Sequence, residues 1–495
     1  MSVVDRQTRR DAFARALPYR ELLLPAVAAL AGLALLLYAY RGLAERPFVA
    51  DDYQWLLNVR GLGLGQVVRA AFDAGAQSHF YRPLIWLLFW RQLQLFGLEP
   101  RGYHQVSLAL HVLNAVLLAT LAWRLGAGRW SGLLAAIFAL LHPAPFEAIV
   151  WISAQSELLA AGLLLAMLHL WRWPSRFAPL LATVALGLAL LARESAVIGL
   201  PLLVLLGRPA DDDDRSSDGA ALAGLRFGPR RTFSAVRDYA LPTLVTLAYV
   251  ALQITIERRN YLLSGGYGLG PQLIANPLRS LALIVAPLPG TEHADALWLL
   301  PLGAIIALGL LALFGYGLSG VRRLLLALLL TLLPTAPFAS PPDSRYLYLP
   351  VFATALLLAF SHDERRTLPR NLDERHNRAL RRRLLIVSGW LLVALLAWSA
   401  AREIAAREGR FAAASGPGGS LWHTTTALCR EDTPKRVIVI DPPLAAPHVE
   451  AIIQLSCGAD VRPLIVGRDQ AAQAITPGSA IIGFSEGSAQ IEQRP

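Results

Sequence analysis

The sequence carries little charge for its length. Only 16% of its 495 residues are Asp, Glu, Lys or Arg, whereas 55% are hydrophobic and the mean hydropathy is +0.45. A soluble globular domain usually has about a quarter of charged residues. This shortage excludes an ordinary soluble protein, and the long apolar runs indicate an all-α polytopic membrane protein.

Cysteine and lysine are scarce as well. The two cysteines, Cys429 and Cys457, lie in the polar C-terminal part, so a thiolate metal site in the apolar region is excluded. They could form a disulfide outside the cytoplasm or remain two buried thiols. Nearly all cationic residues are Arg, with Lys435 an exception. These Arg residues cluster between apolar runs, as the positive-inside rule expects, which argues against a nucleic-acid partner despite the net charge of +11.

About eleven apolar runs predict the path of the chain through the membrane. The first, 21–40, can span a bilayer and is not followed by a small-residue cleavage motif, so we expect an anchor rather than a signal peptide. The other expected spans are 104–123, 130–141, 157–171, 177–191, 195–206, 239–256, 297–317, 324–337, 346–360 and 384–400. Segment 277–289 is short and interrupted by proline, which predicts a re-entrant or lateral segment.

Basic turns give the orientation of these spans. The Arg-rich segment 1–20 and the basic loop 361–383 fall on the same side when the spans are counted. Because cytoplasmic segments carry the excess of Arg, we expect a cytoplasmic N-terminus and an extracytoplasmic C-terminus. The membrane is expected to be a bacterial inner (plasma) membrane.

The chain divides into two expected parts. Residues 1–400 form the transmembrane domain, whose first outer loop, 41–103, contains amphipathic stretches that predict interfacial helices at 66–74 and 83–96. Residues 401–495 are more polar and predict a small extracytoplasmic α/β domain. Its pattern favours strands at 436–441, 461–466 and 479–484 and a helix at 447–455.

Two adjacent acids, Asp51 and Asp52, follow the first apolar run. Carboxylates at the mouth of a membrane span are costly unless they face water or serve a site. Such a carboxylate can take a proton from a hydroxyl group to which a sugar is being transferred. A solvated turn after the first span is the other interpretation.

The expected topology gathers further polar side chains on the outer face. Carboxylates together with several arginines suit a reaction in which a base deprotonates a hydroxyl while guanidinium groups hold a phosphate leaving group. Alternatively, each Arg binds lipid phosphate or a neighbouring acid. The set consists of Asp51, Asp52, His79, Tyr81, Arg82, His104, His142, Glu147, Arg193, Glu194, Arg258, Arg259, His293, Asp343, Arg345 and Tyr346.

Three histidines have ordinary explanations as well. His104 and His111 are seven residues apart on one helical face, which fits helix packing or hydrogen bonding better than metal ligation. His142 precedes Pro143, so we expect it to mark the end of a helix.

Several short segments resemble a known family in their order and spacing. They are Tyr81-Arg82-Pro83-Leu84, Gly102-Tyr103-His104, His142-Pro143-Ala144-Pro145-Phe146-Glu147, Trp151-Ile152-Ser153, Glu157-Leu158-Leu159-Ala160, Arg193-Glu194-Ser195-Ala196 and Ser344-Arg345-Tyr346-Leu347-Tyr348-Leu349-Pro350. With the early acid pair, they resemble the membrane part of the transmembrane O-mannosyltransferases that carry tetratricopeptide repeats, over roughly residues 48–360. That family belongs to the membrane glycosyltransferases with the GT-C fold.

The resemblance implies inverting sugar transfer outside the cytoplasm from a polyprenyl-phosphate sugar, without a cofactor or catalytic metal. The acid pair would hold the base, with Asp51 the first choice and Asp52 in a different role. Arg82, Arg193 and Arg345 would lie near the donor phosphate. The other candidate site residues are Tyr81, His104, His142, Glu147, Glu194 and Tyr346. The implied partners are the donor, membrane lipid and an acceptor protein, glycan or lipid.

The chain departs from that family at two places. No tetratricopeptide repeat follows the last span, and Asp343-Ser344-Arg345 stands where the family pattern has Glu-Arg. Both departures leave the acceptor open. A transporter or flippase of lipid-linked sugars, an inactive assembly protein and a metal-dependent transferase remain the alternative hypotheses.

Overall fold

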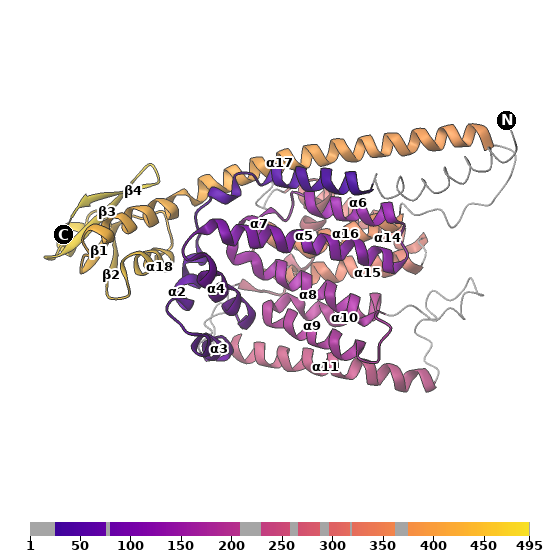
Figure 1. The fold of residues 1–495 in the computed structure, drawn as a ribbon, viewed down its shortest axis with the longest axis horizontal. Coiled ribbons are helices and arrows are strands. Elements are labelled where there is room, and N and C mark those ends of the chain that lie inside the picture. Colours follow the sequence, from indigo (N-terminus) through magenta and orange to yellow (C-terminus); the bar gives the residue numbers. More distant parts are fainter. Residues whose placement is uncertain are drawn as a thin grey trace, which may run out of the picture.

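A bundle of helices forms most of the protein, and a small sheet domain lies at one end of it (Figure 1). The structure is a computed structural model that describes residues 25–75, 80–207, 229–257, 266–287, 297–316, 319–361 and 375–494. The bundle contains α5 (Pro100–Leu125), α6 (Arg129–Leu141), α8 (Gln155–Trp171), α9 (Ala178–Ala192), α10 (Gly199–Leu206), α11 (Pro229–Glu257), α13 (Gln272–Val285), α14 (Leu299–Tyr316), α15 (Ser319–Leu332) and α16 (Tyr348–Ser361).

Four helical stretches of the described chain are long and apolar enough to cross a membrane: Pro25–Glu45, Pro100–Leu125, Ile152–Trp171 and Asp238–Ile256. Shorter apolar helices make up the rest of the bundle, so the protein is a multi-pass membrane protein, while the number of eleven spans stays a prediction. Segment 277–289 was expected to be broken by proline, but α13 continues through Pro277.

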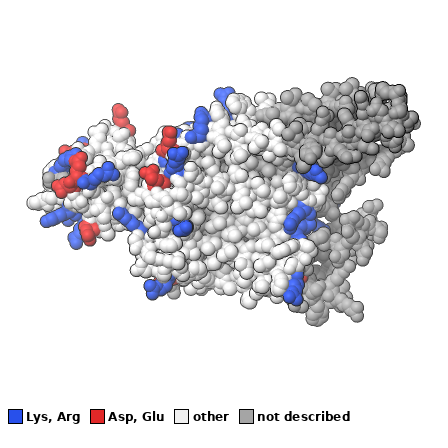
Figure 2. All heavy atoms as spheres, in the orientation of Figure 1, with Lys and Arg blue, Asp and Glu red and all other residues white. Residues whose placement is uncertain are grey.

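The outer surface of the bundle suits a lipid environment. On α14, Ile305, Leu308 and Leu311 are each 66–67% exposed, and their spacing of three places them on one helical face. Figure 2 shows a broad band across the bundle with almost no charged side chains, while charges gather over the sheet domain. Inside, small residues allow close packing: a Cβ atom on Gly199 of α10 would lie 2.6 Å from Leu186 and 2.7 Å from Leu164.

A layer of short helices covers the end of the bundle that faces the sheet domain (Figure 1). It consists of α2 (Asp51–Val59), α3 (Leu64–Phe72) and α4 (Pro83–Phe96), the last two of which were predicted, whereas α2 was not. Two other short helical segments, α7 (Phe146–Val150) and η2 (Ile152–Ala154), lead into α8. η1 (Leu43–Glu45), η3 (Glu194–Ile198), η6 (Leu333–Thr335) and η7 (Ser344–Leu347) are single turns of 3₁₀ helix.

One long helix, α17 (Arg375–Glu431), runs from the bundle into the sheet domain (Figure 1). The span and domain boundary expected at residue 400 fall within this uninterrupted helix. Arg407 of α17 is buried and donates hydrogen bonds to the carbonyl oxygens of Pro143 at 3.4 Å and Pro287 at 3.1 Å. These contacts hold the helix against the bundle.

The sheet domain contains β1 (Arg436–Ile440), α18 (Ala446–Cys457), β2 (Arg462–Val466), α19 (Ala471–Ala474), β3 (Ser479–Ser485) and β4 (Ser488–Gln493). The strand order is β2-β1-β3-β4, with β1 parallel to β2 and β3, and β4 antiparallel to β3. Cys429 of α17 and Cys457 of α18 form a disulfide with 5.1 Å between their Cα atoms. A single apolar core joins this domain to α2, α3 and α4.

Candidate active site

The two acids at the start of α2 point to different partners. The side chain of Asp52 is buried and accepts hydrogen bonds from the backbone N–H of Val49 at 2.9 Å, from the backbone N–H of Ser153 at 2.7 Å and from the Ser153 hydroxyl. Asp51 is 50% exposed, and its Oδ1 atom lies 3.2 Å from Nε2 of His448. Of the pair, only Asp51 therefore has a carboxylate open to an incoming substrate.

Burial also sets the electrostatics of Asp52. Removal from water raises the pKa of Asp52 to about 7, although the hydrogen bonds from Ser153 and Val49 favour the charged form. A buried carboxyl group whose pKa lies near 7 is typical of functional sites.

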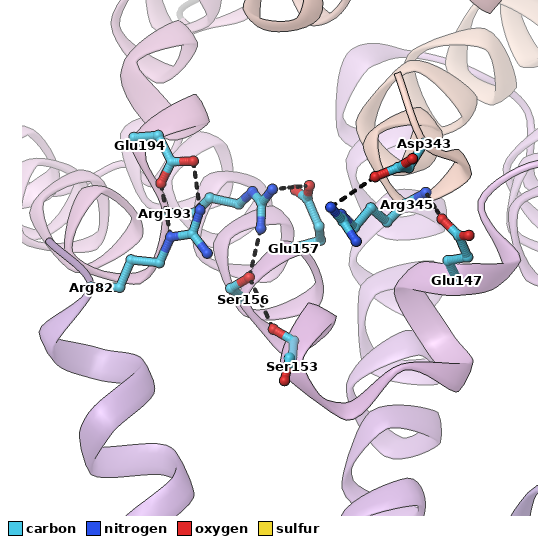
Figure 3. Close-up of polar contacts among 9 residues, drawn as sticks. All are labelled: Arg82, Glu147, Ser153, Ser156, Glu157, Arg193, Glu194, Asp343 and Arg345. Atoms are coloured by element: carbon cyan, nitrogen blue, oxygen red, sulfur yellow. Dashed lines mark hydrogen bonds and ion pairs between the residues drawn. The ribbon is translucent and has the colours of Figure 1, made fainter. Parts of the chain in front are cut away.

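Three ion pairs form a cluster near Ser153, the residue that binds Asp52 (Figure 3). Arg82 binds Glu194 through two hydrogen bonds of 2.7 and 2.9 Å. Arg193 pairs with Glu157 at 2.8 Å, and both side chains are at most 5% exposed. The third pair is more open: Arg345 lies 2.8 Å from Asp343, whose side chain is 49% exposed.

Aromatic rings bring two of these arginines together. The guanidinium carbons of Arg193 and Arg345 each lie 5.1 Å from the ring centre of Tyr346. Arg345 also lies 4.5 Å from the ring centre of Trp151. Such contacts hold guanidinium groups in a fixed orientation.

A chain of hydrogen bonds connects Asp52 to the arginine cluster. Ser153, which binds Asp52, accepts a hydrogen bond through its carbonyl oxygen from the hydroxyl of Ser156 at 3.5 Å. The hydroxyl of Ser156 in turn accepts a hydrogen bond from Arg193 at 2.7 Å. The segment from η2 into α8 is thus a common support for Asp52 and Arg193 (Figure 3).

Glu147 supports the loop that carries Arg345. Its carboxylate accepts a hydrogen bond from the backbone N–H of Arg345 at 3.3 Å, and its own N–H donates to the Ser344 hydroxyl at 3.4 Å. Burial, and then the charge of Asp343, raise the pKa of Glu147. The backbone contact assigns Glu147 to positioning the loop.

Three predicted site residues bind backbone carbonyl groups instead of the cluster. The hydroxyl of Tyr81 donates to Phe72 at 3.3 Å, His104 donates through Nε2 to Arg46 at 3.3 Å, and His142 donates through Nε2 to Ile284 at 2.9 Å. These contacts tie separate segments of the chain together. His79, Arg258, Arg259 and His293 lie outside the described residues.

Four contributors to the site were not predicted as site residues: Trp151, Ser153 and Glu157, which were quoted only within the segments that carry the resemblance, and Ser156. All four belong to the segment from the end of α7 to the first turn of α8. An acid within the first turn of an apolar helix was the available signal for Glu157, since a buried charge there needs a partner. Ser153 lay within a quoted segment, and Ser156 carried no comparable signal.

The chain is similar to known proteins in fold and, over part of its length, in sequence. No protein-family model matches the chain. The crystal structure of ArnT from Cupriavidus metallidurans in the apo state covers 95% of this chain and 94% of ArnT, with a TM-score of 0.52 and 13% sequence identity. The chain has the ArnT fold. ArnT bound to undecaprenyl phosphate gives a TM-score of 0.50 and 14% identity, and covers 93% of this chain and 92% of ArnT.

Two curated relatives are similar to part of the chain. Protein O-mannosyl-transferase Tmtc1 of Drosophila melanogaster is 30% identical over 250 residues, which are 46% of this chain and 28% of that protein. Protein O-mannosyl-transferase TMTC1 of Mus musculus is 32% identical over 222 residues, 39% of this chain and 23% of that protein. The chain thus spans about a quarter of the length of these relatives. The resemblance to the GT-C glycosyltransferase fold and to the O-mannosyltransferases is confirmed.

Proposed function

We propose that the protein is a glycosyltransferase that moves a sugar from a polyprenyl-phosphate donor to an acceptor hydroxyl group, with inversion, on the extracytoplasmic face. The observation that carries this proposal is the half-exposed carboxylate of Asp51, whose neighbour Asp52 is connected through Ser153 and Ser156 to a cluster of oriented arginines. The fold supports it, because ArnT, which shares the fold, has been crystallised with undecaprenyl phosphate. The similarity to proteins named O-mannosyl-transferases supports sugar transfer as the reaction.

Asp51 is the general base in this mechanism. As the acceptor oxygen attacks the anomeric carbon, its proton moves to the Asp51 carboxylate, and the bond between that carbon and the phosphate oxygen breaks. General base catalysis contributes roughly 10²–10⁴-fold to such a step. Asp52 has a different role: its buried hydrogen bonds to Val49 and Ser153 fix the start of α2, so that Asp51 points outward.

Arg345 is the arginine best placed to bind the donor phosphate. Its partner Asp343 is half exposed, and an ion pair that is open to water contributes less than a buried one, so a phosphate can displace Asp343 more easily than it could displace Glu157 from Arg193. Arg193, by contrast, is buried with Glu157, and separating a buried pair is strongly unfavourable. Arg193 therefore positions Ser156 and Tyr346, and Arg82 stays with Glu194 as a support.

The proposal is tested by lipid and glycan mass spectrometry on cells that lack the protein and are complemented with variants. Wild type should restore a glycan that disappears without the protein, whereas Asp51→Asn should not and should accumulate the polyprenyl-phosphate sugar. Asp73→Asn is the matched control, because Asp73 is an exposed acid at the end of α3. Restoration of the glycan by Asp51→Asn would refute the role of Asp51 as the base.

A purified assay separates transfer from transport. Protein in liposomes is given a labelled polyprenyl-phosphate mannose and a chelator, and both glycosyl transfer and lipid movement between leaflets are measured. Transfer in the presence of the chelator supports the proposal. Lipid movement without transfer would favour a flippase, and transfer that stops with the chelator would favour a metal-dependent enzyme.

A further inference from the structure

We infer that the C-terminal sheet domain completes this site, with His448 of α18 as the residue that positions the Asp51 carboxylate. The inference rests on the proposed role of Asp51 as the base. Nothing in the sequence of the sheet domain suggests chemistry, and its similarity to ArnT is one of fold alone. The supporting observation is a contact between His448 and Asp51, which are 397 residues apart in the chain.

The contact itself has suitable geometry. Nε2 of His448 lies 3.2 Å from Oδ1 of Asp51, and the imidazole is 22% exposed. A ring nitrogen that donates to one carboxylate oxygen fixes the rotation of the group and leaves the other oxygen for the acceptor proton. His448 thus acts through Asp51, and the transferred proton remains on the Asp51 carboxyl group.

The helix that carries His448 is fixed at its other end too. Arg60, which follows α2, donates a hydrogen bond to the carbonyl oxygen of Gln454 at 3.2 Å and another to that of Leu455, both near the end of α18. An arginine near the last turn of a helix can donate hydrogen bonds to the carbonyl groups that lack partners within the helix. The disulfide at Cys457 links the same end of α18 to α17.

Apolar packing holds the sheet domain against helix α2. The ring of Tyr53 in α2 lies 5.9 Å from that of Trp422 in α17; Tyr53 belongs to the core that the sheet domain shares with the short helices, and Trp422 packs against that core. Figure 1 shows α18 beside α2 at this end of the bundle. The imidazole is therefore delivered to Asp51 by a packed interface, which limits its movement.

The experiment compares three variants at His448, made in the whole chain, in the purified transfer assay. His448→Ala should lower kcat about ten- to hundredfold, as expected when a reacting group loses its orientation, with little change in KM for the donor. His448→Gln should recover most of the loss, because its amide Nε2 lies where the imidazole Nε2 lay. His448→Asn places its amide one bond short and should resemble Ala.

Two controls separate positioning from docking. Arg60→Ala removes the tether at the far end of α18 but leaves the imidazole and the packed interface, so it should lower kcat less than His448→Ala does. His423→Ala removes an exposed imidazole from α17 and should have no effect. Intact Cys429–Cys457 disulfide and unchanged elution from a sizing column show that a variant is folded.

The possible results lead to different conclusions. Wild-type kcat in His448→Ala, equal losses in the Gln and Asn variants, or an equal loss in Arg60→Ala would each overturn the inference. If Asp51→Asn is inactive in those cases, the proposed function stands without the His448 contact. If Asp51→Asn keeps wild-type turnover, the proposed base itself is wrong.

Discussion

Replacing Asp52 with Asn is expected to change how the stability of the protein depends on pH. Burial raises the pKa of Asp52 from 3.8 to about 7. A carboxyl group with a raised pKa binds its proton more tightly in the folded state, so its contribution to stability is fully present below about pH 4 and is lost as pH rises through about 7. A shift of about three units corresponds to about 4 kcal/mol at most.

Asn has the shape of the carboxyl group but cannot ionise. The stability of the wild type relative to Asp52→Asn should therefore fall between about pH 4 and pH 8. Thermal unfolding of both proteins in detergent at a series of pH values measures this difference. Ser153→Ala is the companion variant: it removes a hydroxyl group that lowers the pKa of Asp52, so it should move the loss to higher pH.

The result would refute the reasoning if the two unfolding temperatures changed in parallel over the whole pH range. It would also do so if Ser153→Ala moved the loss to lower pH. The expected result has a functional meaning, because it would show that the chain keeps an ionisable group that reduces its stability at neutral pH. Retention of such a group is typical of a site where function opposes stability.

Two substitutions test the division of roles within the site, and a double substitution tests the disulfide. Arg345→Ala should lower kcat/KM for the donor about 10²-fold without loss of folded protein, since its ion pair is partly exposed; steady-state kinetics and sizing measure the two quantities. Arg193→Ala should destabilise the protein by about 3–5 kcal/mol, because it leaves Glu157 buried without a partner; an unchanged unfolding temperature would contradict this. Replacing both Cys429 and Cys457 with Ser should lower the free energy of unfolding by about 3 kcal/mol, because the disulfide joins residues 28 positions apart and so constrains the unfolded chain. Thermal unfolding under oxidising conditions measures this loss.

The sequence was informative about which arginines belong together, but it did not reveal their partners. Arg82, Arg193 and Arg345 were expected near the donor phosphate because the resemblance to the O-mannosyltransferases implied it. Arg193 pairs with Glu157 because of the way the chain turns from η2 into α8, and the hydrophobic pattern of the sequence does not predict that turn. The same limit applies to Asp52, whose burial depends on Ser153, a hundred residues away along the chain.

Two features of the C-terminal part illustrate where local patterns are insufficient. Strand β4 has the sequence Ser-Ala-Gln-Ile-Glu-Gln, and its pattern is too polar to predict a strand before β3 is seen to pair with it. Helix α17 passes through Ser415-Gly416-Pro417-Gly418-Gly419, a segment whose composition favours a break. Tertiary packing overrides that preference: a Cβ atom on Gly419 would lie 2.8 Å from Pro47, so glycine allows the helix to approach the segment before α2.

The charges of the resting site favour stabilisation of the product over tight binding of the donor. Three arginines face four acids in the cluster, namely Glu147, Glu157, Glu194 and Asp343, so the site offers no excess of positive charge to a bound donor. A polyprenyl-phosphate sugar is a phosphodiester with one negative charge, whereas the polyprenyl phosphate released gains a second one as the sugar leaves. An Arg345 held loosely by Asp343 can turn to the phosphate as that charge develops. Interactions that strengthen only toward the transition state raise kcat, so this pairing suits catalysis better than a permanently free arginine would.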